Sequence, residues 1–285
     1  MNKLLVVCGP TATGKTALAI MLAKQWNGEL VSADSRQIYK GLDALTGKDR
    51  SDDIPIWLYD VVEPGMAFSV AHFVRLAKSS IENIYKRNKL PILVGGTGFY
   101  LQALTTTVDS LMVPPNPSLR MVLHAASLSS LQEELQLIDS LRWKAMNESD
   151  QKNPRRLIRA IEVARSAKYV PPTMPQYDAL WIGLTSPLSI LEQRIRKRVR
   201  ERFVKAVREV RDGLPSLLGV APLLSYSHGN STKEEALAKW TLSELQYAKR
   251  QMTWFRKQKN IRWFDVSKEG YIGLVEAYVS SWYTH

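Results

Sequence analysis

Apolar residues in the first third of the chain follow two alternating periodicities. A continuous apolar, β-favouring run at residues 4–7 and the strand-like segments at 30–33 and 91–94 have the length of buried strands. Residues 17–26 instead repeat apolar side chains at helical spacing, and so does a stripe formed by Val70, Phe73, Val74, Ala77, Ile81 and Ile84. Strands that alternate with helices predict an α/β fold with a parallel sheet flanked by helices, whose ligands bind at the carboxyl ends of the strands.

The pattern changes after about Thr105, where proline and polar residues interrupt regular structure. A mainly helical stretch without a clear strand then continues to about Ser166. Strand-like runs return at 179–184 and 261–266, together with a long basic helix over 188–212 and a second helix over 240–258. We therefore expect a core in two parts, residues 1–107 and 173–285, separated by an inserted helical lobe at 108–172.

The composition is that of a folded globular protein, with 45% hydrophobic and 23% charged residues among 285. The first apolar run ends at Cys8, which makes it too short for a signal sequence or a membrane span. We expect a cytoplasmic protein that has no membrane partner and acts as a monomer. The single cysteine, Cys8, cannot form an intramolecular disulfide and is interpreted as a small core residue rather than a catalytic thiol.

The charge is unbalanced, since 39 Lys and Arg against 27 Asp and Glu give a formal net charge of +12. Excess positive charge favours encounters with nucleic acid and acidic surfaces, but many basic proteins bind neither. The placement of the charge has to decide between RNA or DNA binding and general basicity.

A phosphate-binding motif follows the first strand directly. The sequence "GPTATGKT" fits G-x-x-x-x-G-K-[ST] between a strand and a helix, and comprises Gly9, Pro10, Thr11, Ala12, Thr13, Gly14, Lys15 and Thr16. Backbone N–H groups and the positive helix end converge on phosphate oxygens, Lys15 adds a charge, and the Thr16 hydroxyl is placed to ligate Mg²⁺. The motif alone does not distinguish ATP from another diphosphate.

Two further loops are expected at the same edge of the sheet. "SADSRQIYKGLD" follows the second strand, and its Asp34 could be a general base, a water-mediated Mg²⁺ ligand or a cap of the following turn. The loop Gly95 to Gly98 offers the Thr97 hydroxyl between glycines that let backbone approach a ligand, or is a glycine turn without a ligand.

The basic helix contributes arginines at a spacing of four. Arg194, Arg198 and Arg202 share one helical face, while Arg196 and Arg200 point elsewhere. Such a helix could be solvated, face RNA or contribute to a phosphate site.

Five ordered segments, "GPTATGKT", "SADSRQIYKGLD", "PILVGGTGFYLQAL", "NPRRLIRAIEV" and "YAKRQMTWFRKQ…IRWFD", resemble those of the tRNA dimethylallyltransferases, also called tRNA isopentenyltransferases. The resemblance extends over nearly the whole chain. It implies a P-loop NTPase-like α/β core with an inserted small helical domain and Mg²⁺ as cofactor. It also implies transfer of the dimethylallyl group from dimethylallyl diphosphate to N6 of adenine 37 in tRNA.

Residue roles follow from the same resemblance. It implies that Asp34 is the base, that Thr97 and Lys15 assist the diphosphate, and that Arg194 and Arg198 contact it. The positions that it implies for contact with the tRNA anticodon stem-loop are Asp34, Ser35, Arg36, Gln37, Thr97, Arg120, Arg155, Arg156, Leu157, Ile158 and Arg159.

The residues agree with this chemistry. An exocyclic amine on a purine is a poor nucleophile, so a carboxylate such as Asp34 that accepts its proton is a sensible requirement. In the late basic segment, Trp254 could stack on RNA or belong to the core. The alternatives are a P-loop small-molecule or nucleoside kinase that uses ATP and a non-catalytic, nucleotide-gated RNA-binding protein.

Overall fold

The computed structural model describes residues 2–106, 113–166 and 177–284. The chain divides into two compact units, one formed by Met1–Thr105 with Pro175–His285 and the other by Thr106–Met174. These boundaries differ by two residues from those expected at 107 and 172. The chain thus forms a larger unit from two separate segments, and the segment between them forms a smaller unit.

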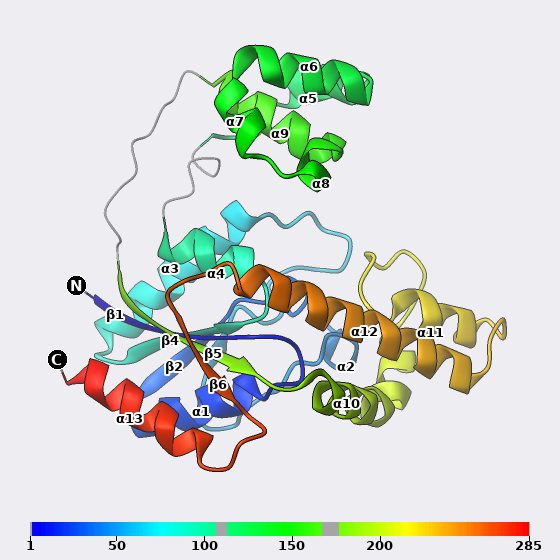
Figure 1. The fold of residues 1–285 in the computed structure, drawn as a ribbon. Coiled ribbons are helices and arrows are strands. Elements are labelled where there is room, and N and C mark those ends of the chain that lie inside the picture. The colour runs from blue at the N-terminus through cyan, green and yellow to red at the C-terminus, as the bar shows by residue number, and fades with distance from the viewer. Residues whose placement is uncertain (1, 107–112, 167–176, 285) are drawn as a thin grey trace. The chain divides into compact units, whose positions relative to one another are not determined.

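The larger unit contains one six-stranded sheet in the order β3-β2-β4-β1-β5-β6, in which every neighbouring pair is parallel (Figure 1). The strands are β1 (Asn2–Cys8), β2 (Gly28–Ser32), β3 (Ile56–Trp57), β4 (Leu90–Gly95), β5 (Tyr177–Thr185) and β6 (Ile261–Asp265). The predicted parallel α/β architecture is confirmed. The central strand β1 is buried from Leu4 to Cys8, as expected for a parallel strand covered on both faces.

Helices cover both faces of this sheet (Figure 1). On one face, α1 (Lys15–Gln25) and α13 (Tyr271–Tyr283) bury apolar residues such as Leu22 and Val275 against Leu5 and Val7. On the other face, α3 (Val70–Lys86) and α4 (Gly98–Thr105) pack Phe73 and Leu101 against Leu4 and Val6. Alternate residues of β1 therefore serve two separate cores.

A third core lies beside the carboxyl ends of the strands (Figure 1). It joins α2 (Asp43–Thr46), α10 (Leu188–Glu209), α11 (Val220–Ser227) and α12 (Lys233–Phe255) around the fully buried Trp240. The helix α12 begins seven residues before the predicted start at 240, because Thr232 and Glu235 form a capping box. This core holds the basic helix α10 over the phosphate-binding loop.

The smaller unit is helical throughout its described residues. It consists of α5 (Pro117–His124), α6 (Leu128–Ile138), α7 (Ser140–Ala145), α8 (Glu148–Gln151) and α9 (Pro154–Ala164). Its core includes Leu123, Leu131, Leu135, Leu157 and Ile161. Within the described part of either unit, no helix is long and apolar enough to cross a membrane.

Candidate active site

The phosphate-binding motif forms a closed loop between β1 and α1. Gly14 caps α1 in the left-handed conformation, at φ 84°, so the helix begins at Lys15. The Lys15 Nζ donates a hydrogen bond to the Pro10 carbonyl at 2.7 Å, and the Thr13 hydroxyl donates to the same oxygen at 2.9 Å. The first N–H groups of α1 have no intrahelical acceptor, so this end of the helix favours an anion.

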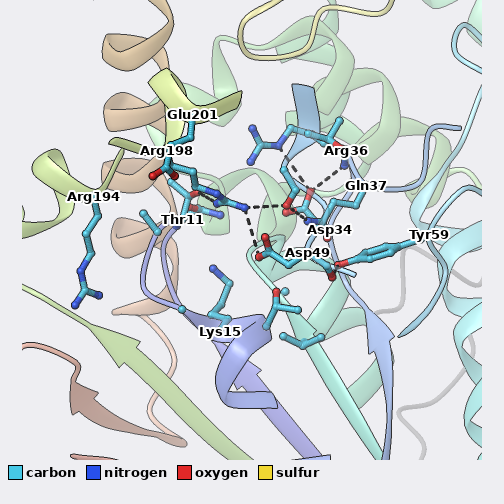
Figure 2. Close-up of a pocket in the computed structure, with 18 of the residues that line it drawn as sticks. Thr11, Lys15, Asp34, Arg36, Gln37, Asp49, Tyr59, Arg194, Arg198 and Glu201 are labelled. Carbon is cyan, nitrogen blue, oxygen red and sulfur yellow. Dashed lines mark hydrogen bonds and ion pairs between the residues drawn. The ribbon is translucent and has the colours of Figure 1, made fainter. Parts of the chain in front are cut away.

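A pocket of about 340 Å³ opens in front of this loop (Figure 2). It lies wholly within the larger unit and at the carboxyl edge of the sheet. Its lining comprises Thr11, Ala12, Gly14, Lys15, Thr16, Asp34, Arg36, Gln37, Thr46, Gly47, Asp49, Tyr59, Val94, Gly95, Arg194, Lys197, Arg198, Glu201 and Gln251. Of the predicted donor-binding residues, the loop, Asp34, Arg194 and Arg198 are brought together here.

The Lys15 ammonium lies deep in this pocket. Burial lowers its pKa to about 8, the Asp34 carboxylate acts in the opposite direction, and the positive charge of Arg198 lowers the pKa further. An anion that binds between Lys15 and Arg198 would relieve both the burial penalty and the mutual repulsion of the two cations. The electrostatics of the pocket therefore favour a diphosphate.

Asp34 caps a turn, which is one of the three roles that the sequence left open, and its position is compatible with the other two. One carboxylate oxygen accepts a hydrogen bond from the Arg36 backbone N–H at 2.9 Å, which caps the turn after β2. The same carboxylate lines the pocket opposite the phosphate-binding loop (Figure 2). Because a carboxylate has two oxygens with several lone pairs, capping does not prevent Asp34 from accepting a proton from a bound substrate.

Hydrogen bonds and a ring contact fix the residues that follow Asp34 in the chain. The Gln37 amide nitrogen donates to the Gly47 carbonyl at 3.0 Å, and the Ser32 hydroxyl donates to Gln37 Oε1 at 3.0 Å. The Arg36 side chain is only 11% exposed, and its guanidinium lies 4.2 Å from the Tyr247 ring centroid. Arg36 is thus largely enclosed by protein while it also lines the pocket, and its predicted contact with tRNA stays a prediction.

Thr97 lies next to Asp34 rather than on the pocket wall. Its hydroxyl accepts a hydrogen bond from the Ser35 backbone N–H at 3.0 Å and lies 3.3 Å from the Ser35 hydroxyl. It also hydrogen-bonds the side chain of Tyr247. Thr97 therefore supports the Asp34 turn, and its predicted contact with the diphosphate stays a prediction.

Glycine is required at Gly96 and Gly98 because side chains of α12 pack closely against them, whereas the sequence suggested the approach of a ligand. A Cβ at Gly96 would lie 2.1 Å from the amide nitrogen of Gln251, and a Cβ at Gly98 would lie 2.1 Å from the Trp254 ring. Close packing of α12, not the approach of a ligand, requires glycine at these two positions. Trp254 is half-buried against the core, which favours its interpretation as a packing residue.

The three arginines on one face of α10 differ in depth. Arg198 reaches the loop, with one guanidinium nitrogen 3.4 Å from the Thr11 hydroxyl and the other donating to the Gly47 carbonyl at 2.8 Å. Arg194 is exposed at the edge of the pocket (Figure 2). Arg202 lies behind Arg198 and donates to the Ala44 carbonyl at 3.1 Å. Of the two arginines predicted to bind diphosphate, Arg198 is the better placed.

Several lining residues carried no chemical signal in the sequence. Asp49 and Tyr59 come from the connections around β3, a two-residue strand that the apolar pattern did not predict. The Tyr59 ring extends into the pocket beside Asp49 (Figure 2). Gln251 reaches the loop from α12, where it stands among residues predicted to be helical.

A divalent cation has suitable oxygen ligands in this pocket. Among the described residues no group of three or more His, Cys, Asp or Glu side chains could hold a metal ion alone. The Thr16 hydroxyl and the carboxylates of Asp34 and Asp49 nevertheless line the same pocket. Mg²⁺ is usually held by one or two carboxylates together with substrate phosphate oxygens, so this donor set fits the ion once a diphosphate is bound.

The arginines of the smaller unit that are predicted to contact tRNA differ in whether a carboxylate pairs with them. Arg120 donates to the buried Glu162 carboxylate at 2.8 Å, Arg159 pairs with the same carboxylate, and Arg156 pairs with Asp150. Arg155 is exposed. These arginines stay candidates for RNA contact, although three of them already pair with two carboxylates within the lobe.

Leu157 and Ile158 require a correction. Their side chains are 0% and 3% exposed and pack in the core of the lobe. The apolar face of α9 turns inward, so these two side chains present no surface to RNA and instead hold the helix that carries Arg155.

Comparisons with known proteins agree over almost the whole chain. The profile of the IPP transferase family matches residues 37–258, and that of the isopentenyl transferase family matches residues 2–59. The chain is 38% identical to the tRNA dimethylallyltransferase of Anoxybacillus flavithermus, over 94% of this chain and 92% of the relative. It is 35% identical to the corresponding protein of Halalkalibacterium halodurans, over 93% and 92%.

Solved structures give the same picture of the fold. The tRNA isopentenylpyrophosphate transferase of Bacillus halodurans matches with a TM-score of 0.71 and 32% identity, over 99% of this chain and 96% of that chain. A eukaryotic dimethylallyltransferase that acts on tRNA matches with a TM-score of 0.79 over 93% of this chain and 74% of that chain. At 23% identity, this second match speaks for the fold alone.

Proposed function

The chain belongs to the IPP transferase family, and we propose that it transfers the dimethylallyl group from dimethylallyl diphosphate to N6 of adenine 37 in tRNA, with release of diphosphate. The observation that carries the proposal is the pocket in which the Asp34 carboxylate faces the phosphate-binding loop. The arrangement supports the proposal, because a loop able to hold a departing diphosphate and a carboxylate able to accept a proton line the same pocket.

The leaving-group half of the reaction falls to the loop. As the bond between the allylic carbon and the diphosphate oxygen breaks, the bonding electron pair moves to that oxygen and negative charge accumulates there. Donors already aimed at this charge stabilise the transition state: the loop N–H groups, the Lys15 ammonium and the Arg198 guanidinium. Mg²⁺ held by Thr16 and the nearby carboxylates would add Lewis-acid stabilisation of the same oxygens.

The nucleophilic half falls to Asp34. The N6 lone pair of adenine forms the new carbon–nitrogen bond, and the nitrogen then loses a proton, which the Asp34 carboxylate accepts. Adenine 37 has to leave the stack of neighbouring nucleobases to enter the pocket, as nucleobases do in other enzymes that modify them. The net charge of +12 supports attraction of the tRNA, and Arg155 is an exposed candidate contact in the lobe.

The direct test uses purified protein, Mg²⁺, dimethylallyl diphosphate labelled in the allyl group, and unmodified tRNA. We expect label in the tRNA and loss of that label when adenine 37 is replaced by another base. Consumption of labelled ATP without labelling of tRNA would instead indicate the kinase. We further propose that the enzyme is cytoplasmic and acts as a monomer, which size-exclusion chromatography of the purified protein would test.

A further inference from the structure

A buried carboxylate next to the site has no part in the chemistry described so far. Glu244, in the middle of α12, has a side chain that is only 4% exposed. Its Oε1 lies 3.7 Å from a guanidinium nitrogen of Arg36 and 3.8 Å from one of Arg202. A carboxylate is costly to bury unless cations compensate it, so these two arginines account for its position.

Arg36 connects Glu244 to the proposed base. The Arg36 Nε lies 3.7 Å from Asp34 Oδ1, whereas a different nitrogen of the same guanidinium group faces Glu244. This Nε is buried and has no hydrogen-bond partner within the described residues. Burial alone would lower the pKa of Arg36, but the carboxylates of Asp34 and Glu244 raise it above its ordinary value. Arg36 is thus a fixed cation shared between two carboxylates.

Arg202 connects Glu244 to the diphosphate side of the pocket. Its Nε donates to the Arg198 carbonyl at 3.2 Å, one helical turn away, and its guanidinium lies 5.2 Å from the Trp240 ring centroid. Burial lowers the pKa of Arg202 to about 10, and the charge of Arg198 lowers it further, while Glu244 acts in the opposite direction. The Glu244 carboxylate is therefore a negative charge that the Arg36 and Arg202 guanidinium groups share.

Asp34 and Arg198 come from distant parts of the chain, and Glu244 contacts an arginine beside each of them. We propose that Glu244 is a positioning residue for prenyl transfer, which holds Arg36 between two carboxylates and thereby keeps the Asp34 carboxylate free to face the substrate. The inference rests on the proposed function, because it concerns the same pocket.

The physical reason is competition for Arg36. With Glu244 present, Arg36 is attracted from both sides and stays 3.7 Å from Asp34, a distance longer than a close ion pair. Without the charge of Glu244, Asp34 is the remaining carboxylate beside Arg36, and repulsion from Arg202 acts in the same direction. A tight Arg36–Asp34 pair would occupy the carboxylate that has to accept the proton.

The test compares Glu244→Gln with Glu234→Gln, a matched loss of charge at an exposed position of the same helix. Wild-type transfer of labelled dimethylallyl to tRNA is measured first, because its absence would overturn the proposed function and this inference with it. We expect Glu244→Gln to lower kcat by about 10-fold or more, since misplacement by about 1 Å can cost on the order of 10²-fold. The Kd for tRNA should stay within about 2-fold, because Glu244 is too buried to contact RNA.

A double-mutant cycle separates positioning from general structural support. In an Arg36→Met background, Glu244→Gln should lower kcat little further, because the side chain through which it acts is gone. Glu244→Asp, which keeps the anion, should lose less activity than Glu244→Gln. Additive losses in the cycle, or a Glu244→Gln enzyme as active as Glu234→Gln, would overturn the inference.

Folding is monitored by the thermal unfolding midpoint of every variant. Should Glu244→Gln lack a cooperative transition, Glu244→Asp takes its place in the cycle with Arg36→Met, and the same non-additivity is expected. A loss of kcat that merely follows the unfolding midpoint across all variants would contradict the positioning role.

Discussion

Gln251 and Thr11 are 240 positions apart in the chain and share a buried hydrogen bond of 2.8 Å, in which the Gln251 side-chain oxygen accepts from the Thr11 backbone N–H. The amide nitrogen of Gln251 donates at 3.0 Å to the Gly96 carbonyl. One side chain from α12 therefore holds the phosphate-binding loop to the loop after β4. The shape of the diphosphate cradle depends on a helix near the other end of the chain.

Gln251→Leu should weaken both stability and donor binding. The substitution leaves a buried N–H and a buried carbonyl without partners, which costs about 1–3 kcal/mol for each group. We expect a lower free energy of unfolding and a higher KM for dimethylallyl diphosphate, measured by denaturant titration and steady-state transfer. Gln246→Leu, at an exposed position of the same helix, is the control, and equal changes in both variants would contradict the role of Gln251.

Asp34→Asn should separate catalysis from binding. The asparagine side-chain oxygen can still accept from the Arg36 N–H, so the turn is preserved while the proton acceptor is lost. We expect a rate loss of about 10²-fold or more, with tRNA affinity within a few-fold of the wild type. Asp53→Asn, which removes an exposed carboxylate paired with Lys24, should transfer normally. Full activity of Asp34→Asn would remove Asp34 from the mechanism.

Glu29 makes a pH-dependent contribution to stability at the other end of β2. Its carboxylate is buried, and hydrogen bonds from Arg87, Lys89 and Trp57 outweigh the burial that opposes ionisation, so its pKa falls from 4.5 to about 2. Since the folded-state pKa is the lower one, the stabilisation is complete above about pH 4.5 and is lost as the pH falls towards 2.

Glu29→Gln tests this contribution. A pKa lowered from 4.5 to about 2 corresponds to about 3 kcal/mol at about 1.36 kcal/mol per unit, so we expect a deficit of that order in unfolding free energy at pH 7. The deficit should shrink between pH 4.5 and pH 2, as the wild-type carboxylate takes up its proton. Urea denaturation at several pH values measures both variants, with the exposed Glu82→Gln as control. A deficit independent of pH would indicate that packing, not charge, is responsible.

The affinity for tRNA should fall steeply with salt, because several basic side chains are expected to displace counterions from RNA phosphates. Replacing the exposed Arg155 with Gln should reduce the slope of log K against log salt by about one unit. Leu157→Met, within the core of the lobe, should leave that slope unchanged. Filter binding between about 50 and 200 mM salt covers the useful range. A wild-type affinity for tRNA that does not change with salt would refute the role of these basic side chains in RNA binding.

The elements predicted correctly are those with strong periodicity or a contiguous motif. The strands around the phosphate-binding loop are short apolar runs, α3 carries a long apolar stripe, α10 is a long basic helix, and the loop itself is eight adjacent residues. The helix α13 and the two-residue strand β3 were not predicted, the latter because so short a run carries no measurable period. Leu157 and Ile158 were assigned to RNA contact by resemblance, yet their side chains are buried in the core of the lobe.

By itself the sequence determined the parallel α/β core, its helical insertion and the meeting of the loop with Asp34, because strand carboxyl ends share one edge of a sheet. Only the tertiary structure decided which way Arg36 points, that Arg198 rather than Arg194 approaches Thr11, and that Gln251 and Glu244 reach the site from α12. Local patterns encode the backbone, whereas contacts between buried polar groups depend on which helices the folded chain packs together.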